Sequence, residues 1–105
     1  MSIDHLTEEE VKIIGECLVA TVEGPFFPDW EFATLFGLER ADVASVMHYW
    51  PNVLGGDERV ALAVNNTLGN LAGYPHGEEL SRFISAPPER LLEILRKWRR
   101  SATDT

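Results

Sequence analysis

Apolar residues recur every three or four positions in three long segments of this chain, and this spacing constrains the fold more than any other feature. It places them along one face of an α-helix, because a helix turns once every 3.6 residues. The three stripes are Val11, Ile14, Leu18 and Val22; Val60, Val64, Leu68 and Leu71; and Leu91, Ile94, Leu95 and Trp98. No segment shows the apolar–polar alternation of a half-buried strand. The pattern therefore predicts an all-α protein.

Capping residues, prolines and glycines indicate where these helices begin and end. Thr7 and the glutamate three residues later have the spacing of a capping box, which predicts that the first helix begins there. Gly24 and Pro25 end it, because proline disfavours helical backbone in the residue before it. The third stripe follows Pro87 and Pro88, which a first helical turn accepts well because its amide donors lack partners.

The same signals predict the limits of the helix that contains the second stripe and three further helices. We expect them over residues 29–36, 40–50, 57–72 and 78–84. Asp29 is a suitable N-cap for the first of these, Gly37 fits its C-terminal end, and Pro51 ends the second. Glycine-containing turns are expected at residues 55–56 and 73–77.

Chain length and cysteine content are typical of one compact domain. A chain of 105 residues can bury a single core without metals or disulfides. Cys17 is the only cysteine, so no internal disulfide can form, and its place on an apolar stripe predicts an inert buried thiol. We expect a small orthogonal bundle of five or six helices over residues 1–105, with frayed ends at 1–6 and 101–105.

Residues 29–50 match the spacing of a helix-turn-helix pair. Ala33 allows the two helices to approach closely, and Gly37 tolerates the left-handed backbone of the turn. The apolar positions that pin the second helix across the first are Phe32, Phe36, Leu38, Val43 and Val46. The spacing predicts an angled helix pair inside the bundle.

The chemistry of the second helix of this pair argues against DNA binding. A DNA-reading helix needs basic or amide side chains for base edges and phosphates. This one offers Arg40, Ser45 and His48, with the carboxylates of Glu39 and Asp42 beside them. A helix-turn-helix DNA-binding regulator that uses Arg40, Ser45 and His48 is therefore kept only as an alternative hypothesis, and nucleic acid is not the expected partner.

Charge is distributed unevenly along the chain, whose formal net charge is −8. Residues 1–89 contain 15 acidic and 4 basic residues, whereas residues 90–105 contain 5 basic and 2 acidic ones. An acidic body repels phosphate backbones and favours basic partners. The basic residues near the end also complement the negative end of the last helix dipole. The dipole therefore accounts for their position in the sequence without a bound ligand.

Two groups of residues are candidates for binding a partner or ligand. Arg59, Asn66 and Asn70 align on one side of a helix, where a guanidinium and two amides can bind a carboxylate or a peptide backbone. The alternative is that the amides hydrogen-bond to carbonyls of neighbouring loops. Phe26, Phe27 and Trp30 lie in a proline-bounded connector over residues 25–30, which either covers the core or presents an aromatic surface to a partner.

Catalytic and metal-binding patterns are weak in this sequence. The three histidines lie far apart without metal-ligand spacing, and no glycine pattern for phosphates follows a strand, so no metal or cofactor is expected. Asp42, Ser45 and His48 lie three residues apart on one helix, which splays them rather than forming a triad. A small enzyme or ligand-binding protein is the second alternative.

A protein–protein interaction module is the leading hypothesis from the sequence. The acidic surface and the aromatic connector suggest an inhibitor, adaptor or immunity-type protein whose partner is a basic protein or a second copy as a homodimer. The N-terminus lacks the basic and apolar regions of a signal peptide, and no segment has the apolar length of a membrane span. We therefore expect a soluble, cytoplasmic protein without a membrane partner.

Overall fold

The chain is helical over the residues that the computed structural model describes, which are 5–53, 57–73 and 77–103. These residues form α1 (Glu8–Glu23), α2 (Asp29–Phe36), α3 (Arg40–Tyr49), α4 (Glu58–Gly73), the 3₁₀-helix η2 (Gly77–Arg82) and α5 (Pro88–Thr103). The all-α prediction is therefore confirmed. The turn predicted at residues 55–56 lies outside the described residues, as do residues 74–76 of the turn predicted at 73–77, whose end residues Gly73 and Gly77 belong to α4 and η2.

Local capping determines where α1 begins and ends, as the sequence predicts. The Thr7 hydroxyl accepts a hydrogen bond from the Glu10 amide at 3.1 Å, and the Glu10 carboxylate accepts one from the Thr7 amide at 2.8 Å. At the other end, the Gly24 amide donates to the carbonyl of Ala20, and Gly24 itself has extended backbone. Both ends of α1 are thus determined by hydrogen bonds between residues within one helical turn of the boundary.

The start of α2 differs from the prediction, because Pro28 and not Asp29 occupies the N-cap. Proline has a fixed φ near −65°, and here φ is −70° with ψ at 152°, the extended backbone that an N-cap adopts. Asp29 is consequently the first helical residue, and its carboxylate is available to another partner. The predicted end is confirmed: Gly37 has φ of 68°, and its amide donates to Ala33.

Two further boundaries differ from the sequence-based expectation. Residues 78–84 do not form an α-helix: the segment is the 3₁₀-helix η2, a tighter conformation common in short connecting segments. At the other end of the chain, α5 continues through Thr103, whereas fraying was expected from residue 101. The helical hydrogen bonds of α5 therefore extend beyond its apolar stripe.

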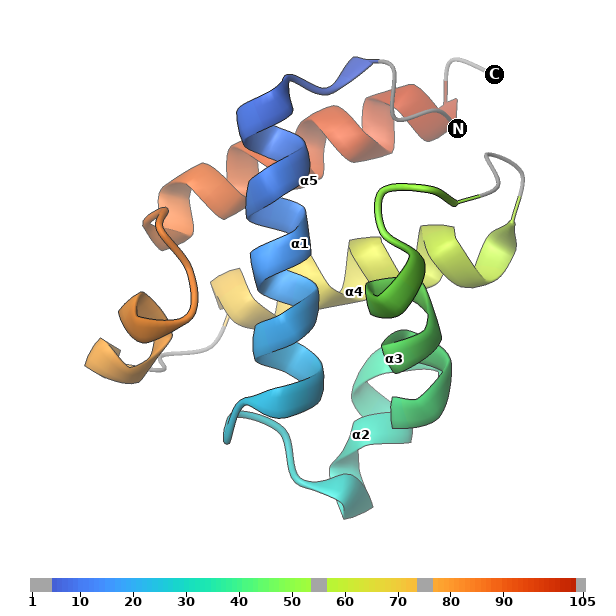
Figure 1. The fold of residues 1–105 in the computed structure, drawn as a ribbon, viewed down its shortest axis with the longest axis vertical. Coiled ribbons are helices and arrows are strands. Elements are labelled where there is room, and N and C mark those ends of the chain that lie inside the picture. Colours follow the sequence, from blue (N-terminus) through green and yellow to red (C-terminus); the bar gives the residue numbers. More distant parts are fainter. Residues whose placement is uncertain (1–4, 54–56, 74–76, 104–105) are drawn as a thin grey trace.

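The helices pack across one another around α4, which contacts α1, α2, α3 and α5. Figure 1 shows α1 along the longest axis of the molecule, with α4 and α5 crossing it. All residues of the second and third apolar stripes are buried, as predicted. In the first stripe Ile14 and Leu18 are buried, while Val11 and Val22 are half-buried. The amphipathic pattern thus identified the core correctly.

Trp50 connects the end of α3 to the first half of α1. Its indole N–H donates to the carbonyl of Val11 at 2.9 Å, and its ring lies against Gly15, where a Cβ would be only 3.2 Å from the indole. The missing side chain at Gly15 therefore allows this close approach. Among the described helices, none has the length and apolar character needed to cross a lipid bilayer.

Candidate functional site

The aromatic connector is divided between the core and the surface. Phe27 is buried and makes an edge-to-face contact with Phe36 at 5.0 Å, and the half-buried Phe26 makes another with Phe83 at 5.5 Å. Trp30 is 83% exposed. The connector therefore covers the core through its two phenylalanines and presents the indole to solvent, so each of the two sequence interpretations applies to part of it.

Trp30 lies in the first turn of α2 and is close in sequence to three carboxylates. The C-terminal end of α1 and the start of α2 both lie toward the lower end of Figure 1. Asp29 and Glu31 flank the indole in sequence, and the exposed Glu23 ends α1. We call these four residues, Glu23, Asp29, Trp30 and Glu31, the acidic tip. Within the described part of the chain, no aromatic ring or cation contacts Trp30.

Arg40 is the cation closest to the acidic tip, but its guanidinium is directed inwards. It donates hydrogen bonds to the carboxylate of Asp29 and to the carbonyls of Thr21, Val22 and Phe27. It also lies over the ring of Phe32, 4.4 Å from the centroid. Because the last carbonyls of a helix lack partners within the helix, Arg40 satisfies the C-terminal end of α1.

This placement bears directly on the residues of the DNA alternative. Ser45 and His48 are exposed on α3, whereas the guanidinium of Arg40 is engaged by hydrogen bonds within the chain. Sequence reasoning did not detect the role of Arg40, since its acceptors lie 11 to 19 residues away. An arginine after a helix-turn-helix glycine carries no local signal of such contacts.

The two amides of the row on α4 form hydrogen bonds within the chain. Asn66 donates from Nδ2 to the carbonyl of Phe36 at 2.7 Å, and Asn70 donates to that of Leu35 at 3.2 Å. These are the last carbonyls of α2, so the two amides cap α2 from a neighbouring helix. The contacts supply the tertiary support that a helix rich in asparagine requires.

Arg59 does not join the two amides. Its guanidinium is half-exposed and lies 4.0 Å from the carboxylate of Asp42. Together with Ser45 it lines a shallow cavity of about 250 Å³ between α3 and the start of α4. The predicted row thus has two sets of partners: Arg59 lies near Asp42 and lines a cavity with Ser45, whereas the two amides bind carbonyls of α2.

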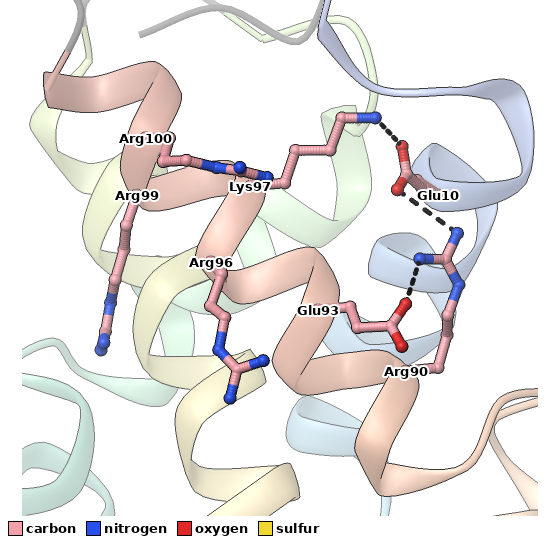
Figure 2. A pocket seen from close by; sticks show the side chains of 7 residues that line it. All are labelled: Glu10, Arg90, Glu93, Arg96, Lys97, Arg99 and Arg100. Carbon is pink, nitrogen blue, oxygen red and sulfur yellow. Dashed lines mark hydrogen bonds and ion pairs between the residues drawn. The ribbon is translucent and has the colours of Figure 1, made fainter.

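The opposite end of the molecule has a depression of about 620 Å³ between α5 and the first turn of α1. Its lining is mostly basic and consists of Glu10, Arg90, Glu93, Arg96, Lys97, Arg99 and Arg100. Figure 2 shows Glu10 between the side chains of Lys97 and Arg90, while those of Arg96 and Arg99 extend away from it. The basic residues therefore fall into an inner pair and an outer group.

The inner pair binds a buried carboxylate. The side chain of Glu10 is 4% exposed; Lys97 Nζ lies 2.7 Å from its Oε1, and Arg90 Nη2 lies 3.3 Å from its Oε2. Burial by itself raises the pKa of Glu10, but the hydrogen bonds from Lys97 and the Thr7 amide, together with the charges of Lys97 and Arg90, outweigh it and lower the pKa. Glu10 is consequently ionised at neutral pH and joins α1 to α5.

The outer group lies on the solvent side of α5. Arg96, Arg99 and Arg100 are exposed, and Leu92, one turn before Arg96, is 38% exposed. We call these four residues the basic face. Arg99 donates from Nε to Asn65 at 2.8 Å, and no described carboxylate lies within 4.0 Å of Arg96 or Arg100. The helix dipole accounts for the positions of these residues in sequence but does not engage their side chains.

Residues considered for catalysis are not arranged for it in the described part of the chain. No hydrogen bond there joins Asp42, Ser45 and His48, and Asp42 instead accepts from the Glu39 amide at 3.1 Å. Cys17 is fully buried, and this burial, with the nearby charge of Glu16, raises the pKa of its thiol. Among the same residues, no group of three histidine, cysteine, aspartate or glutamate side chains could hold a metal ion.

Comparisons with models of protein families, with curated proteins and with solved structures gave no significant match. Function must therefore be argued from the surfaces of this chain. Two of them stand out by charge and exposure, the acidic tip at one end and the basic face at the other.

Proposed function

We propose that this protein is a protein–protein interaction module that binds a basic partner through its acidic tip. The main support for this proposal is the exposure of Trp30, which is 83% exposed while the nearby Phe27 is 4% exposed. An indole left in water gives up the hydrophobic stabilisation that its burial would provide. Tryptophan is also enriched among the residues that dominate binding energy in protein interfaces.

The charges around Trp30 define the chemistry of the partner. Asp29 and Glu31 flank Trp30 in sequence, the exposed Glu23 ends α1, and the guanidinium of Arg40 forms an ion pair with Asp29. A lysine or arginine side chain of the partner would pair with these carboxylates, and it could also stack on the indole ring. The net charge of −8 adds long-range attraction for a basic protein and increases the rate of encounter.

The proposal is tested by affinity capture from extracts of the cells that make the protein, with Trp30→Ala compared with the wild type. Tyr49→Ala is the matched control, because Tyr49 is also an exposed aromatic residue, at 61%, but lies at the end of α3. The expected result is a protein retained by the wild type and by Tyr49→Ala and lost with Trp30→Ala. Replacing a central tryptophan weakens binding by about tenfold or more.

Measurement of the captured complex at increasing salt then tests the charge argument. The association rate should fall between low and physiological ionic strength, because the Debye length shortens to about 8 Å. Equal capture by the wild type and by Trp30→Ala would contradict the role of the acidic tip. An association rate that does not change with salt would contradict the basic partner.

A further inference from the structure

We infer that the basic surface bound by the acidic tip is the basic face of a second copy of this chain, and that copies associate head to tail, the acidic tip of one on the basic face of the next. The inference rests on the proposed function of the acidic tip and names its partner. It follows from one observation: this chain carries, on its own α5, an exposed surface whose chemistry complements the acidic tip.

The two surfaces match group by group. Arg96 and Arg100 lie one turn apart on the solvent side of α5, and no described carboxylate is within 4.0 Å of either. Each guanidinium group can donate two hydrogen bonds to a carboxylate of the tip in bidentate geometry. Trp30 can stack on a guanidinium of the same face, with Leu92 supplying apolar contact at its side. The acidic tip thus supplies carboxylates and an indole, and the basic face supplies guanidinium groups and an apolar side chain.

The fold prevents the two surfaces from meeting within one molecule. The acidic tip lies where α1 ends, at the lower end of Figure 1, whereas the C-terminal half of α5 lies at the upper end. The molecule extends 34 Å along its longest axis. A contact between the two surfaces therefore joins two copies and leaves each of them with one unused surface. Such a heterologous contact continues into a chain or closes into a ring.

The net charge of each copy opposes this association at long range, and this repulsion makes the association depend on ionic strength. Each copy carries −8, so copies repel one another at low ionic strength, where the Debye length reaches about 30 Å. Near 0.1 M salt the Debye length is about 10 Å, which screens this repulsion more than it screens ion pairs in contact. Association should therefore be strongest at intermediate ionic strength, in contrast to the steady fall with salt expected for a partner of net positive charge.

The experiment measures average mass against concentration by sedimentation equilibrium for two complementary variants. Trp30→Ala removes the indole of the tip and retains the basic face. The double variant Arg96→Glu, Arg100→Glu reverses the basic face and retains the tip. All three side chains are exposed, so both variants should fold, which circular dichroism verifies.

The wild type and the control Tyr49→Ala should associate progressively beyond the dimer. Each variant alone should show a self-association constant at least tenfold weaker. An equimolar mixture of the two variants should form a dimer and no larger species, because the mixture restores one competent interface per pair. Growth of the wild type beyond the dimer distinguishes a head-to-tail contact from a symmetric dimer, which uses both surfaces of each copy and stops at two.

Three results would overturn the inference: a wild type that stays monomeric at every ionic strength, variants that associate as the wild type does, or a mixture that remains monomeric. If the wild type is monomeric but Trp30→Ala still loses a captured basic protein, the inference fails and the proposed function stands. If Trp30→Ala matches the wild type in both experiments, both fail.

Discussion

Lys97 and Glu10 are separated by 87 positions in sequence, yet Nζ of the lysine lies 2.7 Å from Oε1 of the glutamate. The same carboxylate caps α1 through the Thr7 amide and accepts a hydrogen bond from Arg90. One side chain therefore completes the N-terminal capping box of α1 and holds α5 against it. A buried ionised carboxylate is tolerated there because each of its oxygens has a charged partner.

Replacement of Glu10 by glutamine tests this arrangement through pH. Because the pKa of Glu10 is lowered by folding, its stabilisation is present above the ordinary value of 4.5 and is lost as pH falls through the lower folded-state pKa. Glu10→Gln should lower the free energy of unfolding by about 1–3 kcal/mol at neutral pH. In urea titrations below pH 4.5, the difference from the wild type should shrink.

Glu9→Gln is the matched control for this prediction. Its side chain is 73% exposed and lies 3.7 Å from Arg90, so its removal should hardly change stability. A difference between Glu10→Gln and the wild type that stays constant from neutral to acidic pH would contradict the assignment of the acid-sensitive stabilisation to Glu10.

Arg40→Lys should destabilise the protein even though it keeps the positive charge. The guanidinium donates hydrogen bonds to three backbone carbonyls and to Asp29 at once, and an ammonium group cannot reproduce that geometry. We expect a loss of about 2–3 kcal/mol in the free energy of unfolding, since buried acceptors are left without partners. Arg59→Lys, at a half-exposed residue, should stay within about 0.5 kcal/mol of the wild type.

Asn66→Ala should destabilise the protein by about 1–2 kcal/mol, because the carbonyl of Phe36 loses its side-chain donor. Asn52→Ala is the control, since Asn52 is exposed. Urea denaturation of both variants measures the difference. If Asn66→Ala is as stable as Asn52→Ala, the amide row does not support α2 in the way that its hydrogen bonds indicate.

Two glycine-to-alanine substitutions should change stability in opposite directions. Gly69 lies inside α4, and a Cβ there would meet only Leu95 at an ordinary 3.9 Å, so Gly69→Ala should stabilise the protein by about 0.5–1 kcal/mol. Gly37 has φ of 68°, and Gly37→Ala should destabilise it by about 1 kcal/mol through backbone strain. Thermal denaturation of both variants checks the signs, and a shared sign would contradict this account.

Thr67→Val should be neutral or stabilising, by up to about 1 kcal/mol. Thr67 is fully buried, and within the described structure its hydroxyl has no hydrogen-bond partner. Valine keeps the shape of the side chain and removes the unsatisfied group. Thr67→Ser, which keeps the hydroxyl and removes the methyl group, should destabilise the protein, and chemical denaturation of the pair separates the two contributions.

The helices could be read from the sequence because their signals are local. Thr7 and Glu10 are one turn apart, Gly37 directly follows α2, and each apolar stripe spans a single helix. Helix start, helix end and buried face depend on residues within a few positions of one another. The errors were local as well: Asp29 was preferred to Pro28 as the N-cap, and the short η2 segment was expected to be α-helical.

The roles of individual polar and aromatic side chains were decided by the tertiary structure. Arg40, Glu10 and Asn66 each bind groups between 11 and 87 residues away, so no spacing in the sequence marks them. Phe27 and Trp30 belong to one aromatic segment, yet only the second faces solvent. The sequence determined the helices and their apolar faces, because hydrophobic periodicity acts within one helix. The angles at which the helices cross decided which charges are paired inside and which remain for a partner.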